Sequence, residues 1–326
     1  MLYIKSPSTD PTFNIAAEEY LLKIFSDDIF FLYRNESSVI IGKHQNTLEE
    51  VNIDFVNRNG IRVVRRLSGG GTVYHDLGNV NFSLIINGIE HRLVDFRRYT
   101  LPVIAALQSL GVDARFEGRN DIRVNGKKIS GNAEHLYRNR VLHHGTLLYS
   151  SNLFNLNEAI RVKHQGYQSK AVKSVRSTVA NISDFCTDPP SIGEFINIVF
   201  DNVRTAYAGG VEYLFTNKDM DAIGSLVESK YSQWSWTYGY SPSYHLTRDF
   251  TVNHSTYRFN LLIDKGVIIK IGIENDELTL TRVSEIEKML TGIPHIPETV
   301  TKALKGVIVE EHLPGLTADI LSGLLF

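Results

Sequence analysis

Two arginines precede three consecutive glycines in the segment Arg65–Asp76, which reads RRLSGGGTVYHD. Glycine has no Cβ, so this backbone can turn sharply and approach a ligand closely. Arginine side chains beside exposed backbone N–H groups suit a carboxylate or a phosphate. The segment is neither a P-loop, because no Lys-Ser or Lys-Thr follows the glycines at the required spacing, nor a dinucleotide-binding fingerprint. A glycine run alone is more often a surface turn, so other parts of the chain must decide between a turn and an anion site.

A second polar cluster lies in the segment 118–133, GRNDIRVNGKKISGNA, where Asn125-Gly126 predicts a tight hairpin turn. The register expected from that turn puts Asp121 opposite Ser130. Strand alternation then predicts one buried face and one polar face. The buried face would hold Ile122, Val124 and Ile129, and the polar face Asp121, Arg123, Lys128 and Ser130. This pattern indicates a lysine held near a carboxylate, or else the solvated face of an ordinary hairpin.

Three further features could carry chemistry. Adjacent residues on a strand point to opposite sides, so we expect one of His143 and His144 to be packed and the other to touch a site; this interpretation is favoured over a zinc site. The segment 170–177, KAVKSVRS, could line an anionic ligand or form a basic loop. Cys186 has no basic neighbour in sequence, which favours a buried structural thiol over a nucleophile.

The elements that position these residues are predicted from periodicity and capping signals. Strands and helices mix irregularly, which favours an α+β domain with a mixed sheet over a doubly wound parallel sheet. A strand is expected at 2–5 and a hairpin from 30–34 and 38–42. Helices are expected at 12–25, 47–59, 95–110, 191–207 and 216–231. The first is expected to have Thr12 or Asn14 as its cap, and the second to end at Gly60. The third is expected to have Pro102 near its first turn, and the fourth to have a capping box of Ser191 and Glu194.

We expect the aromatic segment 231–242 to fold back onto the large domain. The residue pattern after it predicts a small α+β domain. Strand-like runs occur at 250–253, 256–263, 267–273 and 278–283, and helices are expected at 284–290 and 316–325. We place the boundary near Tyr244–Thr247, which gives domains of residues 1–245 and 246–326.

Composition limits the class of protein. With 326 residues, 43% apolar residues and a net charge of −2, the sequence is typical of a globular protein with no nucleic-acid partner. No apolar stretch approaches the roughly 20 residues of a membrane span. The single cysteine and the lack of a signal-like start favour a cytoplasmic location.

Taken together, five motifs resemble those of lipoate-protein ligases in order and spacing, and the similarity extends over essentially the whole chain. They are RRxSGGGxVYHDxGN at 65–79, GRND at 118–121, KISGNA at 128–133, HHGT at 143–146 and KSVRS at 173–177. The resemblance implies a large α+β catalytic domain related to biotin ligases and octanoyl transferases, followed by a small accessory domain. It also implies that lipoate and MgATP give lipoyl-AMP and pyrophosphate, after which the lipoyl group passes to a lysine of an apo lipoyl domain, in E2 subunits of 2-oxoacid dehydrogenases or the glycine-cleavage H protein.

The resemblance further implies roles for individual residues. Lys128 would be the catalytic lysine that contacts both lipoate and nucleotide, and Asp121 a candidate Mg²⁺ ligand. The residues that would bind ATP and lipoyl-AMP are Arg66, Ser68, Gly70, Gly71, Thr72, Val73, Tyr74, Asn79, Asn120, Asp121, Lys128 and Ala133. Those that would bind lipoate are Arg66, Gly70, His75, Lys128 and His144. We expect a monomer with no tightly bound prosthetic group.

Two other functions remain open from the sequence. One is an octanoyl or lipoyl transferase that works between carrier proteins without ATP, and the other is a non-catalytic lipoate or adenylate sensor. Dependence on ATP separates the ligase from the transferase, and product formation separates both enzymes from a sensor. No residue is singled out as general base for the incoming lysine.

Overall fold

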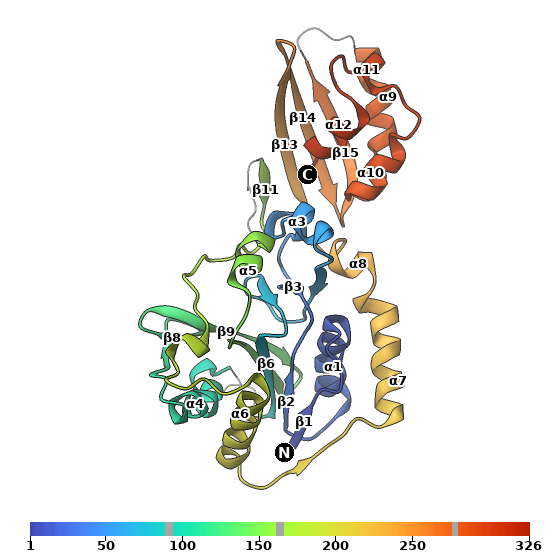
Figure 1. Ribbon diagram of the computed structural model, residues 1–326. Helices are drawn as coiled ribbons and strands as arrows, with labels where there is room; N and C mark the ends of the chain where they lie inside the picture. Colours follow the sequence, from blue (N-terminus) through green and yellow to red (C-terminus); the bar gives the residue numbers. More distant parts are fainter. Residues whose placement is uncertain (89–93, 161–165, 276–279) are drawn as a thin grey trace. The chain divides into compact units, whose positions relative to one another are not determined.

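The computed structural model describes residues 1–88, 94–160, 166–275 and 280–326 (Figure 1). The chain divides into two compact units. The first contains Met1–Lys43, Val51–Arg161 and Lys173–Gln233, and the second contains His44–Glu50, Val162–Val172 and Trp234–Phe326. Two short segments that come much earlier in the chain therefore belong to the same unit as the C-terminal residues.

Within its described residues, the first unit is built on an eight-stranded sheet in the order β12-β1-β2-β6-β10-β9-β8-β7. Strands β12, β1 and β2 pair in parallel, whereas the other neighbours are antiparallel. The sheet is therefore mixed, which confirms the predicted α+β class. The bounds are β1 Leu2–Lys5, β2 Ile29–Tyr33, β6 Asn79–Asn87, β7 Arg115–Glu117, β8 Asp121–Val124, β9 Lys127–Tyr137, β10 Arg140–Leu148 and β12 Val211–Glu212.

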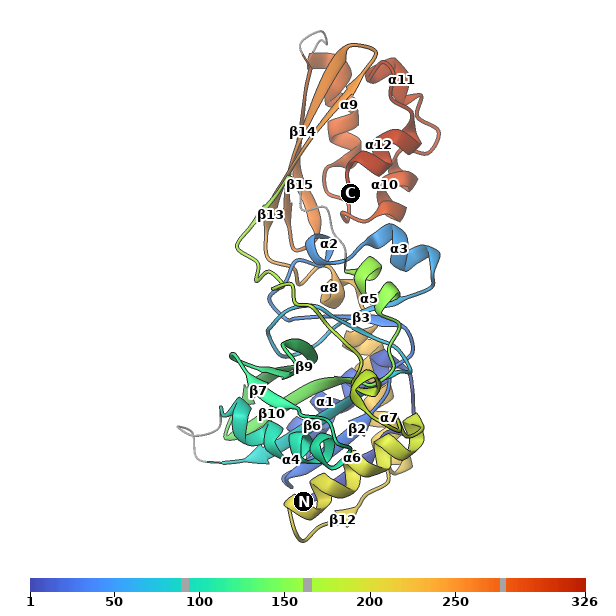
Figure 2. The same cartoon turned by 60° about the vertical axis from the view of Figure 1, so that its left-hand side comes forward.

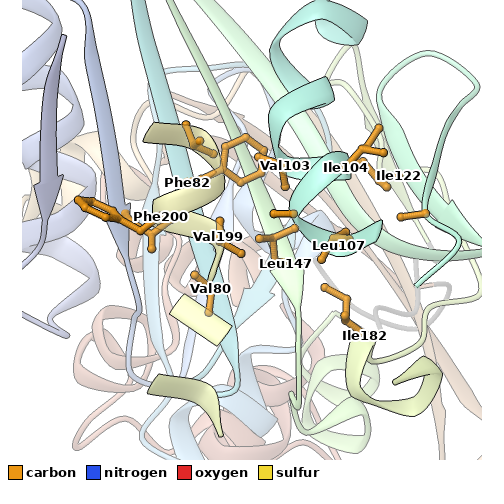
Figure 3. Close-up of a cluster of buried hydrophobic side chains, with 14 of the residues drawn as sticks. Val80, Phe82, Val103, Ile104, Leu107, Ile122, Leu147, Ile182, Val199 and Phe200 are labelled. Carbon is orange, nitrogen blue, oxygen red and sulfur yellow. The ribbon is translucent and has the colours of Figure 1, made fainter. Parts of the chain in front are cut away.

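One face of this sheet is apolar and is covered by helices α4 (Phe96–Ser109) and α6 (Ile192–Ala206). Figure 2 shows the two helices lying over the sheet. Alternate residues of β6, such as Val80 and Phe82, pack against these helices, and Figure 3 shows their side chains. The capping box of Ser191 and Glu194 is present as predicted. The prediction for Pro102 was wrong: α4 begins at Phe96 with Asp95 as its cap, so Pro102 lies inside the helix and not in its first turn.

The opposite face carries helix α1 (Pro11–Ile24). Its cap is Asp10, whose carboxylate accepts from Thr12 N–H and Phe13 N–H, so the prediction of Thr12 or Asn14 was wrong.

A separate three-stranded sheet has the order β4-β3-β5 among the described residues. Its strands are β3 Ser38–Ile41, β4 Arg62–Arg65 and β5 Val73–His75. The predicted hairpin of 30–34 and 38–42 is wrong, because β2 pairs with β1 and β6 while β3 pairs with β4 and β5. Both strands are buried throughout, so their local sequences carry no signal that they belong to different sheets.

Two predicted helices are interrupted. The helix expected at 47–59 is divided into α2 (Thr47–Glu50) and α3 (Ile53–Arg58), because the Asn52 side chain accepts from Phe55 N–H and starts a new helix. The helix expected at 216–231 is α7 (Asn217–Leu226), capped by Thr216, followed by one π-helical turn (Val227–Tyr231). The first unit also contains α5 (Leu153–Ala159) and a 3-10 turn, Ile182–Phe185.

The second unit contains a four-stranded sheet, counted over its described residues, in the order β11-β13-β14-β15. Its strands are β11 Tyr167–Ser169, β13 Tyr244–Val252, β14 Ser255–Asp264 and β15 Val267–Glu274, and its helices besides α2 are α8 Trp234–Thr237, α9 Leu280–Leu290, α10 Pro297–Ala303, α11 Val309–His312 and α12 Ala318–Leu324. The meander and the last helix agree with the prediction, except that the first strand, β13, begins at Tyr244 and not at the expected residue 250. Strand β11 and helices α10 and α11 were not foreseen.

Two expectations for this region fail. Residues 280–283 of the strand expected at 278–283 belong to α9, while residues 278 and 279 lie outside the described residues. The segment 231–242 does not all join the large unit: Trp234 belongs to the second unit, where its ring lies against Gly266. Tyr231 packs in the first unit through a hydrogen bond to Glu19.

Candidate active site

Arg66 organises the glycine loop, which we define as residues 68–72. Its Nη2 donates to the carbonyl oxygens of Gly69 at 2.6 Å and Gly71 at 2.7 Å, and its Nε donates to Ser68 Oγ at 2.9 Å. Its Nη1 donates to the Ile40 carbonyl at 3.0 Å. The side chain is buried, and burial lowers its pKa to about 10. In this structure Arg66 shapes the loop, a role that the resemblance did not imply.

The three glycines occupy different environments. Gly70 has φ +85°, a left-handed conformation that favours glycine, and a Cβ there would lie 3.2 Å from Arg66 Nη2. A Cβ at Gly71 would meet Ser174 Oγ at 3.1 Å, whereas one at Gly69 meets no atom within 4 Å. The Thr72 N–H donates to Ser174 Oγ at 2.9 Å, so the KSVRS segment lies against the loop.

The hairpin of β8 and β9 has the predicted turn, with φ +49° at Asn125 and +75° at Gly126. A bulge beyond Arg123 changes the register, so Asp121 lies opposite Gly131 and not opposite Ser130. Ser130 is fully buried, which corrects its predicted place on the polar face. The extra residue shifts the alternation by one position, and the turn signal alone could not show that shift.

Lys128 and Asp121 form an ion pair on this hairpin, with Nζ 2.8 Å from Oδ1. The other oxygen of Asp121 accepts from Arg123 Nη2 at 2.7 Å. The side chains of Lys128 and Asp121 keep 24% and 15% of their surface exposed, so both can meet a ligand. The expected lysine beside a carboxylate is therefore present.

The segment 173–180 joins the hairpin to the glycine loop. The Lys128 N–H donates to the Thr178 carbonyl at 2.9 Å, and the Ala180 N–H donates to the Lys128 carbonyl at 3.1 Å. The same segment supplies Ser174 to the Thr72 N–H. The segment 173–180 therefore contacts both the glycine loop and the β8–β9 hairpin, which are about 50 residues apart in the sequence.

His144 connects helix α1 to the glycine loop. Its Nε2 lies 2.6 Å from Ser68 Oγ, and its Nδ1 lies 2.9 Å and 3.0 Å from the two carboxylate oxygens of Glu18. Glu18 also accepts from Ser83 Oγ at 2.5 Å and Tyr33 OH at 3.0 Å. Burial acts to raise the pKa of Glu18, but the interactions with His144, Ser83 and Tyr33 outweigh it and hold that pKa below its usual value.

Glu18 is a site residue that was not predicted from the sequence. A signal was present, because Glu18 interrupts the apolar stripe of helix α1 between Ile15 and Leu22, three residues after the first and four before the second. A charge in a buried stripe needs partners.

His143 points to the other side of β10, as adjacent strand residues must. It is fully buried beside the rings of Phe82, Phe96 and Tyr99, and its Nδ1 lies 2.9 Å from Glu134 Oε1. Burial lowers its pKa. One histidine is thus packed and the other contacts the loop, which agrees with the expectation.

Other predicted residues surround the loop. The Asn35 amide donates to His75 Nδ1 at 3.0 Å, and burial lowers the pKa of His75 to about 3, so this ring is neutral with its hydrogen on Nε2. Asn79 is buried and donates to Asn81 Oδ1 at 2.7 Å. Ala133 pairs with His144 in the sheet and lies near Gly70.

Tyr74 and Asn120 have structural contacts of their own. Tyr74 packs in a separate apolar cluster with Val39, so only its backbone can serve the loop. Val73 is partly buried. The Asn120 amide donates to the Asn132 carbonyl, which ties the GRND turn to β9.

Cys186 packs against the apolar core beneath α4 and α6, and burial raises the pKa of its thiol. This favours the structural thiol. Among the residues described, no three His, Cys, Asp or Glu side chains are grouped so as to hold a metal ion. Nor does any helix in the described part of the chain have the length and apolar character of a membrane span.

Family models match both parts of the chain: the lipoyl protein ligase A/B catalytic domain at residues 10–204 and the bacterial lipoate protein ligase C-terminus at residues 241–325. The chain is 40% identical over 331 residues to the lipoate-protein ligase LplJ of Bacillus subtilis, covering 100% of both chains. It is 41% identical over 298 residues to lipoate–protein ligase 1 of Staphylococcus aureus, covering 91% of this chain and 90% of that one.

Solved structures agree with this match. A lipoate-protein ligase A bound with ATP superposes with a TM-score of 0.63 and 31% identity, over 73% of this chain and 98% of that one. A bi-partite lipoate protein ligase from Thermoplasma acidophilum, described with its E2 lipoyl domain, gives a TM-score of 0.63 and 30% identity over 73% of this chain and 96% of that one. The chain belongs to the lipoate-protein ligase family.

Proposed function

We propose that this protein activates lipoate with MgATP to lipoyl-AMP and then transfers the lipoyl group to a lysine of apo lipoyl domains. The observation that carries the proposal is the Lys128–Asp121 pair, tied to the glycine loop through the segment 173–180 in a chain that matches lipoate-protein ligases along its length. We assign catalysis to residues 1–245 and an accessory role to residues 246–326.

The first step brings two anions together. A carboxylate must attack the α-phosphate with the reacting atoms about 3 to 3.5 Å apart and in line. Positive charge has to offset their repulsion and the charge that develops in the transition state. Lys128 supplies that charge as a compact ammonium, and its pairing with Asp121 keeps it in place until the ligands arrive.

The nucleotide side of the site uses the glycine loop. Backbone N–H groups of the loop contact phosphate, while Arg66 holds the loop's carbonyl groups away from it. We keep the remaining assignments from the sequence. Nucleotide contacts are assigned to Arg66, Ser68, Gly70, Gly71, Thr72, Val73, Tyr74, Asn79, Asn120, Asp121, Lys128 and Ala133, and lipoate contacts to Arg66, Gly70, His75, Lys128 and His144.

Mg²⁺ would enter with ATP. The carboxylate of Asp121 and the side-chain oxygen of Asn120 are hard oxygen ligands of the kind that Mg²⁺ prefers. Asp121 is the better candidate, since it is partly exposed beside Lys128. When bound, Mg²⁺ would offset phosphate charge.

The proposed acceptors are apo lipoyl domains of 2-oxoacid dehydrogenase E2 subunits and the glycine-cleavage H protein. The Thermoplasma acidophilum relative, described with its E2 lipoyl domain, supports an acceptor of this class. A cytoplasmic location and a monomeric state stay predictions of the sequence; light scattering of the purified protein tests the monomer.

The second candidate function is an octanoyl or lipoyl transferase that does not use ATP. The position of Cys186 is an argument against this function. The related amidotransferases use a cysteine nucleophile, whereas this thiol packs against the apolar core with a raised pKa.

The test is incubation of the protein with lipoate, MgATP and a panel of apo acceptor domains, followed by mass measurement. We expect a gain of one lipoyl group on a domain with its acceptor lysine and none on the same domain with that lysine changed to arginine. Omission of ATP should abolish the gain. Modification from a lipoylated carrier without ATP would establish the transferase, and no product with any acceptor would contradict the proposal.

A further inference from the structure

We infer that Glu18 is a positioning residue for the nucleotide side of the site and acts on the glycine loop through a buried relay of hydrogen bonds. The relay consists of Glu18, His144, Ser68 and Arg66. The inference rests on the proposed function, because it assigns ATP binding to this loop. Glu18 itself is separated from the loop by the His144 ring.

The contacts are continuous from helix α1 to the loop backbone. Glu18 lies 2.9 Å from His144 Nδ1, and His144 Nε2 lies 2.6 Å from Ser68 Oγ. Ser68 Oγ accepts from Arg66 Nε at 2.9 Å, and Arg66 Nη2 donates to the carbonyls of Gly69 and Gly71. All four side chains of the relay are buried.

With His144 as a neutral ring, its partners set the direction of the hydrogen bonds. The carboxylate of Glu18 only accepts, so His144 donates its Nδ1–H to it. A neutral imidazole then presents the lone pair of Nε2 to the Ser68 hydroxyl. The Ser68 hydroxyl can donate to that lone pair and accept from Arg66, so it serves once as a donor and once as an acceptor. Every hydrogen in the relay therefore points from the loop toward Glu18.

Glutamine cannot replace Glu18 in this arrangement. Ser83 and Tyr33 donate to Oε1 of Glu18, and His144 Nδ1 lies 2.9 Å from that oxygen and 3.0 Å from Oε2. A glutamine has nearly the same shape but offers one oxygen and an NH₂ group. With its oxygen at the Oε1 position it still accepts from Ser83 and Tyr33, but its NH₂ group then faces the Nδ1–H of His144. The expected consequence is a mixture of His144 tautomers and a looser contact between Ser68 and Arg66.

The chain contains a matched control. Glu134 of β9 and His143 of β10 form a second buried Glu–His pair at 2.9 Å, on the face of the sheet opposite to His144. His143 is surrounded by Phe82, Phe96 and Tyr99 and has no contact with the glycine loop among its described hydrogen bonds. Glu134→Gln thus disturbs a buried Glu–His pair without touching the relay.

The experiment compares Glu18→Gln with Glu134→Gln in the full chain. The Kd of MgATP is measured by calorimetry without lipoate, and hydrogen exchange is measured at the amides of Gly69 to Thr72. We expect Glu18→Gln to raise the Kd about tenfold or more and to speed exchange in the loop, because a hydrogen bond to a charged group is lost. Glu134→Gln should change neither, while nitrogen NMR should show the mixed tautomers of His144 in Glu18→Gln only.

A double substitution separates the relay from general loosening of the core. If Glu18 acts through Ser68, then Glu18→Gln combined with Ser68→Ala should raise the Kd by less than the product of the two single effects. Glu134→Gln combined with Ser68→Ala should raise the Kd by the product of their two single effects.

An ATP affinity in Glu18→Gln equal to that of Glu134→Gln, or fully multiplicative effects with Ser68→Ala, would overturn the inference. If the unaltered protein does not bind MgATP, the proposed function fails instead. The loop exchange rates and the His144 tautomer then still decide whether the relay exists.

Discussion

The amino group of Lys128 lies 2.8 Å from the carboxylate of Asp121, although the residue directly opposite Asp121 in the hairpin is Gly131. The bulge in β9 places a glycine where a side chain would otherwise stand. A Cβ on Gly131 would come within 2.9 Å of both Cε and Nζ of Lys128. The lysine therefore reaches across the hairpin through space that the glycine leaves open.

Lys128→Ala should abolish adenylate formation and preserve the fold. Loss of a preorganised charge at the transition state typically costs about 10²- to 10³-fold in rate. The partly exposed pair contributes at most about 1 kcal/mol to the free energy of unfolding, and Asp121 keeps Arg123 as a partner. Lipoate-dependent exchange of labelled pyrophosphate into ATP is the assay, and undiminished exchange would show that the assignment is wrong. Lys128→Arg should also be poor, because a planar fork does not replace an ammonium.

Gly131→Ala should impair the same step by displacing Lys128. The atoms that its Cβ would meet are at the end of a flexible side chain, so stability should change by less than about 1 kcal/mol. A shift of the ammonium by about 1 Å should slow pyrophosphate exchange about tenfold or more. Gly193→Ala, at a site with no atom within 4 Å of the new Cβ, is the control and should keep full activity. Equal rates in both variants would contradict this explanation of the glycine.

Alanine should destabilise the protein at the second glycine of the loop, Gly70, but not at the first, Gly69. Gly70→Ala should lower the free energy of unfolding by about 1 to 2 kcal/mol, because an alanine is strained at φ +85°. Gly69→Ala should leave it unchanged or raise it by up to about 1 kcal/mol, since nothing obstructs the new Cβ. Denaturant unfolding of the ligand-free protein measures the free energy of unfolding of both variants. An equal loss of that free energy in Gly69→Ala and Gly70→Ala would be inconsistent with the loop geometry.

The second unit should lose stability in acid because of His295. Its Nδ1 lies 2.6 Å from Tyr244 OH and its Nε2 lies 2.8 Å from the Leu325 carbonyl, and burial lowers its pKa from 6.5 to about 4. The unfolded chain then binds more protons between pH 6.5 and pH 4. The stabilisation is complete above pH 6.5 and is lost as pH falls toward 4, by about 3 kcal/mol in all.

Both tryptophans belong to the second unit, so their fluorescence can follow its unfolding. His295→Gln should be less stable at pH 7 and should show a flatter dependence on pH between 6.5 and 4. The exposed His245→Gln serves as the control and should keep the slope of the unaltered protein. An unchanged slope in His295→Gln would rule out this histidine as the source.

Local signals predicted local structure well. The Asn125-Gly126 turn and the Ser191/Glu194 capping box formed as expected, because each depends on residues close together in the sequence. The division of β2 and β3 between two sheets could not be predicted in this way. Both strands are buried on all sides, and pairing partners far along the chain decide which sheet each one joins.

The candidate site also combines features that the sequence predicts with features that depend on the tertiary structure. By itself, the sequence determined that a glycine loop with two arginines, a lysine on a hairpin and a pair of histidines occur together in the order typical of lipoate-protein ligases. Only the tertiary structure decided that Arg66 binds the loop's own carbonyls, that a bulge sets Gly131 opposite Asp121, and that Glu18 reaches the loop through His144. The physical reason is that residue types specify which groups are available, whereas distances between groups on separate strands and helices depend on how these elements pack.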